Sequence, residues 1–405
     1  MRKTPVLLRQ HIGWHFAKHW VLQGKRKPLD TGAEKILKSK GIAVCKPEDI
    51  IDEKKESKKI EIVDCFDRPP PLDETHPNWH DEILLSYKDD NVLLEGLSQA
   101  KIITNTVEVR QGLPERIQSN ELSEDINEAA KTIIMNSHLL DAEQKKLPKV
   151  KDPERPAWNF PRTYGITQGR RNKLITSKLL NLIESTSGHQ LTKERYLFED
   201  LFFSFPFERN GMLLQFQLSG DFVLTSSKPL SPISEESTEN LELPDIYPVD
   251  PMITLNNENI YETRSIYPIN PNIKKSHPHT LFIHFDREVV KNLFEEVVTD
   301  NQIFGRSLLK TFTVAASYAR QKYGDDVKNL PKPVTLQSVQ TDGRFFHLGV
   351  LQLNTLDLEG TRRNLWYQTP LQYLFDNCGY KVGRPRLEGY NSKVIKQLYG
   401  FYNSV

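Results

Sequence analysis

The sequence contains few cysteines. Only Cys45, Cys65 and Cys378 occur among its 405 residues, and no two of them form a Cys-x-x-Cys pair. A disulfide framework needs regularly spaced cysteine pairs, and a thiolate zinc site needs a cluster of cysteines. The cysteine content therefore excludes a disulfide-stabilised secreted domain and a thiolate zinc site made within this chain. A reducing compartment fits best.

Long apolar runs and cofactor motifs are also lacking. No run of apolar residues approaches the ~20 residues that a membrane-spanning helix needs, so no membrane span is predicted. The sequence has no GxGxxG motif, no P-loop and no GxSxG motif. These are the short signatures of dinucleotide sites, phosphate sites and hydrolase nucleophiles. We therefore predict no cofactor, no metal site and no specific reaction.

Acidic residues are absent from residues 1–29, where basic residues recur. Val6, Ile12, Phe16 and Trp20 can share one side of a helix, with basic residues outside it. Basic charge, lack of acid and an amphipathic pattern are typical of a mitochondrial transit peptide, although the segment is poor in serine. A basic arm on the mature protein is the alternative interpretation.

A second stretch without acid, residues 155–183, combines aromatic and basic side chains in a loop and the start of a helix. Lys and Arg bind phosphates, and aromatic rings stack on unpaired bases, so this composition predicts RNA binding. The candidate RNA-binding residues are Trp158, Arg162, Tyr164, Arg170, Arg171 and Lys173, with Lys381, Arg384 and Arg386 as a second, weaker group. The alternative for the first group is a solvated loop whose aromatic residues cover the core.

Composition divides the chain into five parts. Residues 1–29 are the candidate transit peptide or basic arm, and residues 30–66 are a charged, partly extended segment. An N-terminal α+β portion at 67–227 and a C-terminal one at 252–405 flank residues 228–251, which read as a flexible acidic linker because Ser, Glu and Pro dominate them.

The hydrophobic pattern predicts an α+β fold. Asp342-Gly343 and Asn210-Gly211 are each expected to form a two-residue type I′ turn of a β-hairpin. Residues 345–353 are apolar at nearly every position, as in a strand covered on both faces. Helical periodicity is present at 126–140, 170–185, 305–323 and 391–402. We expect a mixed or antiparallel sheet with hairpins packed against helices, plus extended proline-rich surface segments.

One polar cluster deserves a test as an active site. Asp342, His347 and Asp357 lie close together in the sequence, but His347 and Asp357 would be roughly 30 Å apart along a strand rising about 3.3 Å per residue. A histidine whose ring nitrogens are satisfied inside the sheet is the preferred interpretation. The alternative function, a mitochondrial RNA-modifying or hydrolytic enzyme, would have to use this cluster.

Several segments in a fixed order carry a family resemblance. They are LLEGLSQAKIITNTVEVRQGLPE at 93–115, YPINP at 267–271, HPHTLFI at 277–283, ARQKYGDD at 319–326 and QSVQTDGRFFHLGVLQLNTLDL at 337–358. From about residue 67 to the C-terminus, the chain resembles the metazoan family of the mitochondrial large-subunit ribosomal protein thirty-seven. The first 60 residues and the linker around 231–242 do not follow the family pattern clearly.

The resemblance implies a non-enzymatic structural protein of the mitochondrial large ribosomal subunit, located in the matrix. Mitochondrial ribosomal RNA and other large-subunit mitoribosomal proteins are the implied partners. Among them is a protein similar to this family, mitoribosomal protein sixty-five, formerly small-subunit protein thirty. The family has no catalytic residues to carry over, so the resemblance favours an architectural role for the hairpin around residue 343.

Overall fold

The computed structural model describes residues 19–21, 31–46, 70–109, 112–117, 121–149, 154–155, 157, 161, 163–236, 238–239, 241–294 and 296–405. Contacts divide the chain into two units, Met1–Pro69 and Pro70–Val405. In the first unit, α2 (Ala33–Ser39) buries none of its side chains. The predicted transit peptide lies outside the described residues except for 19–21.

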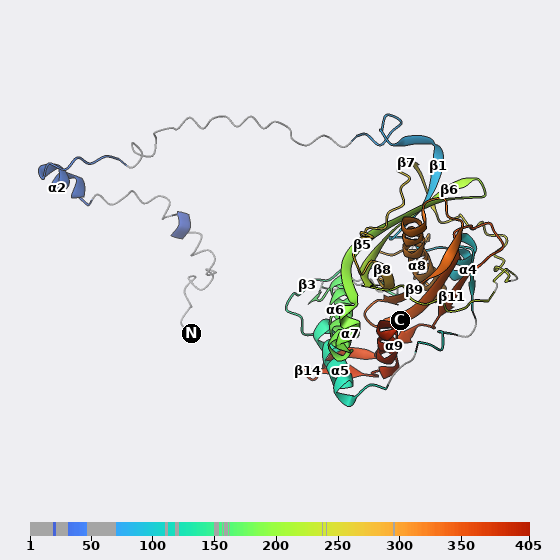
Figure 1. Cartoon of the computed structure of the whole chain (residues 1–405). Helices are drawn as coiled ribbons and strands as arrows, with labels where there is room; N and C mark the ends of the chain where they lie inside the picture. The colour runs from blue at the N-terminus through green and yellow to red at the C-terminus, as the bar shows by residue number, and fades with distance from the viewer. Residues whose placement is uncertain are drawn as a thin grey trace. The chain divides into compact units, whose positions relative to one another are not determined.

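A ten-stranded mixed sheet is the central layer of the second unit (Figure 1). Its strands are β1 (Trp79–Lys88), β2 (Thr106–Glu108), β5 (Arg195–Arg209), β6 (Met212–Ser226), β7 (Asn256–Ile260), β8 (His277–His284), β9 (Asn329–Thr341), β10 (Phe345–Thr355), β11 (Asn364–Gln368) and β12 (Gln372–Tyr373). The order is β2-β11-β10-β9-β8-β6-β1-β7, with β12 beside β10 and β5 beside β6. Strands from both predicted portions, 67–227 and 252–405, thus share one sheet.

Helices cover both faces of this sheet. The helices α4 (Leu97–Ile103) and α8 (Asp300–Tyr323) pack on one face, and α5 (Glu124–His138), α6 (Gln168–Thr186) and α9 (Ser392–Asn403) pack on the other. Side chains of β10 alternate between the two sides: Leu348 and Val350 contact the α6 and α9 side, while Leu351 and Leu353 contact the α8 side. The predicted α+β class and the strand covered on both faces are confirmed.

Helix α8 begins and ends at local signals that its sequence supplies. The side chains of Thr299 and Gln302 form a capping box at its start, and Gly324 ends it with a φ of 98°. The helix is so deeply buried that Lys310 lies inside the fold, where its ammonium pairs with Asp89 and donates to the Ser219 carbonyl at 2.7 Å. Burial, with a smaller effect of Arg306, lowers the pKa of Lys310 to about 8.

The two predicted hairpins differ in their turns. Asn210 and Gly211 have φ of 50° and 70° between paired Arg209 and Met212, which confirms the two-residue turn. At the second hairpin, Thr341 pairs with Phe346, so the predicted two-residue turn at Asp342-Gly343 is wrong.

The turn after Thr341 is longer than predicted because the Asp342 carboxylate binds nearby backbone donors. This carboxylate accepts from the backbone N–H of Arg344 at 2.9 Å and of Phe345 at 2.8 Å. Only Gly343 takes a positive φ there, of 87°. The side chain thereby stabilises a longer turn than the pair of residue types alone suggests.

The segment predicted as a flexible linker, 228–251, makes specific contacts with the sheet. Leu230 is buried and forms a bridge with Thr335 of β9. The side-chain oxygen of Gln352 accepts from the backbone N–H of Ile233 and Ser234, at 2.6 and 2.9 Å. These contacts hold the first part of the segment against β9 and β10.

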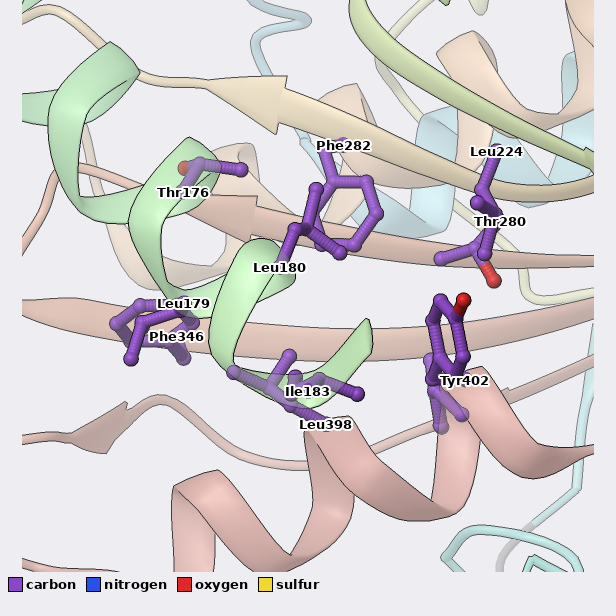
Figure 2. Close-up of a pocket in the computed structure, with 11 residues that line it drawn as sticks. Thr176, Leu179, Leu180, Ile183, Leu224, Thr280, Phe282, Phe346, Leu398 and Tyr402 are labelled. Carbon is purple, nitrogen blue, oxygen red and sulfur yellow. The ribbon is translucent and has the colours of Figure 1, made fainter. Parts of the chain in front are cut away.

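Figure 2 shows where α6 and α9 meet the sheet. Leu180 and Ile183 of α6 point toward Phe282 of β8 and Leu398 of α9 in this apolar region. The remaining cavity is about 10 Å³, close to the smallest space that can hold one water molecule. It is too small for a ligand, so this region is packed core.

We predict that the contact between α4 and α8 tolerates no side chain at Gly305. A Cβ there would lie 2.5 Å from the backbone carbon of Gly96, which cannot move aside alone. Gly305→Ala should lower the free energy of unfolding by about 1–3 kcal/mol or more through overpacking. Gly169→Ala, in α6, meets nothing within 4 Å and should be neutral or stabilising by up to about 1 kcal/mol. Urea unfolding measures both; equal effects would contradict the close packing.

Candidate nucleic-acid interface

A two-stranded hairpin near the C-terminus, β13 (Asn377–Lys381) and β14 (Arg384–Glu388), displays the second group of candidate residues. Lys381 pairs with Arg384 across a two-residue turn whose Val382 and Gly383 have φ of 53° and 72°. Val382 is 96% exposed, so the tip of the hairpin projects into solvent.

The hairpin has one inner and one outer face. Cys378 and Leu387 pair across the strands and pack against the core on the α5 side. The next residues along each strand point the other way because side chains alternate. Lys381, Arg384 and Arg386 therefore share the outer face, opposite the anchored side.

Three cations on this face are balanced by only one carboxylate. Glu388 lies 3.8 Å from the Lys381 ammonium and 3.2 Å from Arg386. Among the described residues, Arg384 has no carboxylate partner. With +3 from the cations and −1 from Glu388, the outer face carries a net charge of +2.

Two cations of the first group, Arg170 and Lys173 in α6, are paired with acids from elsewhere in the chain. Arg170 pairs with Asp141 and also with Glu143, and its hydrogen bond holds the pKa of Asp141 below the ordinary value. Lys173 lies 2.9 Å from Glu199 and 3.5 Å from Asp200. The prediction that no acid lies near this group is therefore wrong. Residues 155–183 contain no acid, but folding brings acids from other segments next to Arg170 and Lys173.

The other members of the first group differ in exposure. Tyr164, in the short strand β4 (Tyr164–Gly165) beside β3 (Lys145–Lys146), is 71% exposed. Arg171 is half-buried, and its Nε has no hydrogen-bond partner among the described residues. Trp158 and Arg162 lie outside the described residues.

The elements that carry the two groups of candidates both contact α5 or the residues that follow it. Helix α5 packs against α6 and against both strands of the hairpin, and the three elements lie together in Figure 1. The Tyr380 hydroxyl of the hairpin donates to the Leu139 carbonyl at 3.5 Å, while Arg170 of α6 reaches Asp141, two residues further. Both contacts with this end of α5 are made by the inner side of the hairpin and by Arg170, whereas Lys381, Arg384 and Arg386 point away from α5.

The proposed catalytic cluster is not assembled. Asp342 caps its own turn, and Asp357 accepts from the backbone N–H of Gly360 at 3.1 Å. His347 is fully buried, with Nε2 at 3.2 Å from the Gln368 side-chain oxygen and its ring 4.6 Å from that of Phe304. Its Nδ1 has no hydrogen-bond partner among the described residues, which corrects the expectation that both ring nitrogens are satisfied. Burial lowers the pKa of His347 to about 3, far below that of a useful general base.

The described residues offer no metal centre, because no three His, Cys, Asp or Glu side chains among them are placed to hold a metal ion. None of the described helices combines the length and the apolar character that a membrane span requires.

Comparison with known proteins gives relatives named as a large ribosomal subunit protein. The chain is 30% identical to the large ribosomal subunit protein mL37 of Bos taurus over 313 residues, which cover 74% of this chain and 68% of the relative. It is 29% identical to mL37 of Rattus norvegicus over the same shares, and 27% identical to mL37 of Gallus gallus over 71% of this chain and 64% of the relative. No protein-family model matches the chain.

We predict that His347 makes the fold sensitive to acid. Its pKa is lower in the folded chain than the ordinary value of about 6.5, so below that pH the unfolded chain binds a proton that the folded chain does not. Stability is therefore complete above about pH 6.5 and falls toward pH 3. His347→Gln should reduce the loss of unfolding free energy between pH 7 and pH 5 by about 2 kcal/mol. Urea titrations at the two values measure this; an identical loss in both proteins would contradict it.

Proposed function

The chain belongs to the family of the large ribosomal subunit protein mL37, and from this premise we propose that it binds ribosomal RNA and neighbouring proteins as a structural constituent of the mitochondrial large ribosomal subunit. Members of this family are components of the mitochondrial ribosome, so the chain is located in the mitochondrial matrix. Identity of 27–30% over about 70% of the chain supports a common role.

The observation that carries the RNA-binding part is the outer face of the β13–β14 hairpin. It projects from the fold, displays Lys381, Arg384 and Arg386 on one side, and keeps a net positive charge after its ion pairs are counted. Cations on a rigid ribbon can contact consecutive phosphates and release the ions condensed around them. Because such contacts carry no base information, the hairpin would position the protein on RNA without reading a sequence.

Contacts with neighbouring ribosomal proteins are supported by exposed apolar side chains. Val289, Phe294 and Val297 lie close together in the chain, and each is at least 60% exposed. Apolar residues gathered on a surface commonly mark a protein contact. The mitoribosomal protein sixty-five, similar to this family, is one neighbour that we propose.

We propose that the protein does this without catalysing a reaction. The alternative, an RNA-modifying or hydrolytic enzyme, would need Asp342, His347 and Asp357 to converge. Instead, each binds a different local partner, and His347 has no exposed surface.

The structural role predicts that the native protein sediments with the large subunit. In a sucrose gradient of mitochondrial extract at high magnesium, it should comigrate with large-subunit ribosomal RNA. Treatment with ribonuclease should shift it to the top of the gradient together with other ribosomal proteins. Protein that remains at the top before that treatment would contradict the proposed role.

The RNA contact predicts a specific salt dependence. Changing Lys381, Arg384 and Arg386 together to Gln should weaken binding to a large-subunit RNA fragment and flatten the dependence of log K on log salt by about two to three phosphate contacts. The matched control changes Arg170, Arg171 and Lys173 to Gln. Its slope should change less, because acids already neutralise Arg170 and Lys173. A hairpin variant with the slope of the parent protein would exclude the hairpin from the RNA contact.

A further inference from the structure

A groove follows the start of β9, beside the last turn of α8 and residues 229–236. It consists of two adjoining cavities of about 260 and 470 Å³. Pro232 and Pro333 line both cavities, so the cavities meet at these two residues. Neither the β13–β14 hairpin nor the exposed apolar side chains near Phe294 line the groove, which is therefore a separate surface of the protein.

The wall formed by residues 229–236 is held in place by the sheet. Leu230 is buried and forms a bridge with Thr335, whose side-chain hydroxyl donates to the Ser231 carbonyl at 3.1 Å. Just beyond this wall, the Thr238 hydroxyl donates to the Arg363 carbonyl at 2.9 Å and accepts from the Arg363 N–H at 3.0 Å. The groove is therefore formed before a partner binds, which reduces the entropy lost on binding.

Lysines occupy one end of the groove. Lys322 and Lys332 line the smaller cavity, and both are exposed. The Lys322 ammonium lies 5.5 Å from the centre of the Tyr318 ring and 5.3 Å from that of the Tyr323 ring. No carboxylate of the described residues pairs with either lysine. Partial burial, with a smaller effect of Lys332, lowers the pKa of Lys322. This end therefore favours an anionic group of a partner.

Carboxylates occupy the other end of the groove. Glu235, Glu236 and Glu239 line the larger cavity, together with Arg362. With −3 from the glutamates and +1 from Arg362, the net charge of this end is −2. The two ends of the groove therefore have opposite charge, and the acidic part of segment 228–251 supplies one of them.

This charge arrangement fits a peptide better than RNA. An RNA strand carries a negative charge on every phosphate, so it would meet the three glutamates at one end. A peptide can carry acidic residues at one end and basic residues at the other. The walls also offer few backbone donors, because four lining residues are prolines: Pro229, Pro232, Pro278 and Pro333. Extended segments commonly bind grooves of this kind through their side chains, against aromatic rings.

We propose that this groove binds an extended segment of another protein, with acidic side chains at the Lys322 and Lys332 end and basic side chains at the glutamate end. Apolar side chains between the two blocks of charge would contact Tyr323 and Val334. Binding at the groove does not depend on the RNA contact of the hairpin. That the partner is a neighbouring protein of the large subunit rests on the proposed function.

A synthetic peptide tests the order of charges. The probe is Glu-Glu-Glu-Pro-Leu-Pro-Lys-Lys-Lys, blocked at both termini, and the control has the same composition with Glu and Lys alternating along its length. Fluorescence anisotropy with the isolated full chain at low salt measures both affinities. The probe should bind at least about tenfold more tightly, since only the probe places each block of charge at the end of opposite sign. Equal affinities would overturn the inference.

Reversing the charge of one end tests where the probe binds. Lys322→Glu together with Lys332→Glu should weaken binding of the probe by about tenfold or more, because like charges then meet at this end. The same variant should bind a peptide with Lys at both ends more tightly than the parent protein does.

The matched control is Lys274→Glu together with Lys393→Glu, which changes two exposed lysines outside the groove and should leave probe binding unchanged. An equal loss in both double variants would assign binding to net charge and overturn the inference. If the groove variant has a lower melting temperature than the parent protein, Lys332→Glu alone, outside α8, should still weaken probe binding. Unchanged binding by that single variant would count against the groove.

Photo-crosslinking in intact mitochondria tests the natural occupant. The full chain carries benzoylphenylalanine in place of Ser231, which is exposed and lines the smaller cavity. It should crosslink to one segment of one other protein, with acidic residues on one side of the crosslinked residue and basic residues on the other. Crosslinks to RNA, to this chain itself or to scattered proteins would overturn the inference, and so would their absence. A segment with this charge order in a protein outside the large subunit would support the groove and contradict the proposed function.

Discussion

The fold depends on one constraint, which is that its central strands are buried on both faces. Strands β8, β9 and β10 bury nearly every side chain, so the sheet must be covered on both sides or expose a large apolar area. Helix α8 meets this requirement on one side, and α5, α6 and α9 meet it on the other. Three features follow from burying so much of this layer. Gly305 of α8 approaches Gly96 closely, Lys310 is buried with Asp89 as its partner, and residues 230–234 are anchored on the sheet.

The exposed elements outside the core are the surfaces on which partners can bind. The β13–β14 hairpin stands outside the main sheet, anchored through Cys378 and Leu387, so its outer face is free to carry charge. A positively charged outer face of this kind fits the RNA-binding role that we propose for the protein.

The sequence predicted the secondary-structure elements, which depend on local signals, better than it predicted the tertiary contacts of those elements. The Asn210-Gly211 turn and the end of helix α8 depend on neighbouring residues, so the Asn-Gly pair predicted the first and helical periodicity the second. The turn at Asp342 was missed because its side chain bonds backbone groups that residue statistics ignore. Arg170 pairs with Asp141, which follows α5, and Lys173 pairs with Glu199 of β5. Both acids lie outside residues 155–183, so the sequence of that stretch could not predict these pairs. The alternation of Lys381, Arg384 and Arg386 around Val382-Gly383 was the available signal for the hairpin, and only the pairing across the turn showed that the three share a face.

Our central proposal is that the fold holds the β13–β14 hairpin against ribosomal RNA. The most direct measurement is an electron cryo-microscopy structure of the mitochondrial large subunit that contains this protein. We expect the side-chain nitrogens of Arg384, and of Lys381 or Arg386, within hydrogen-bond distance of ribosomal RNA phosphate oxygens. A hairpin whose outer face meets only solvent or another protein would contradict the account.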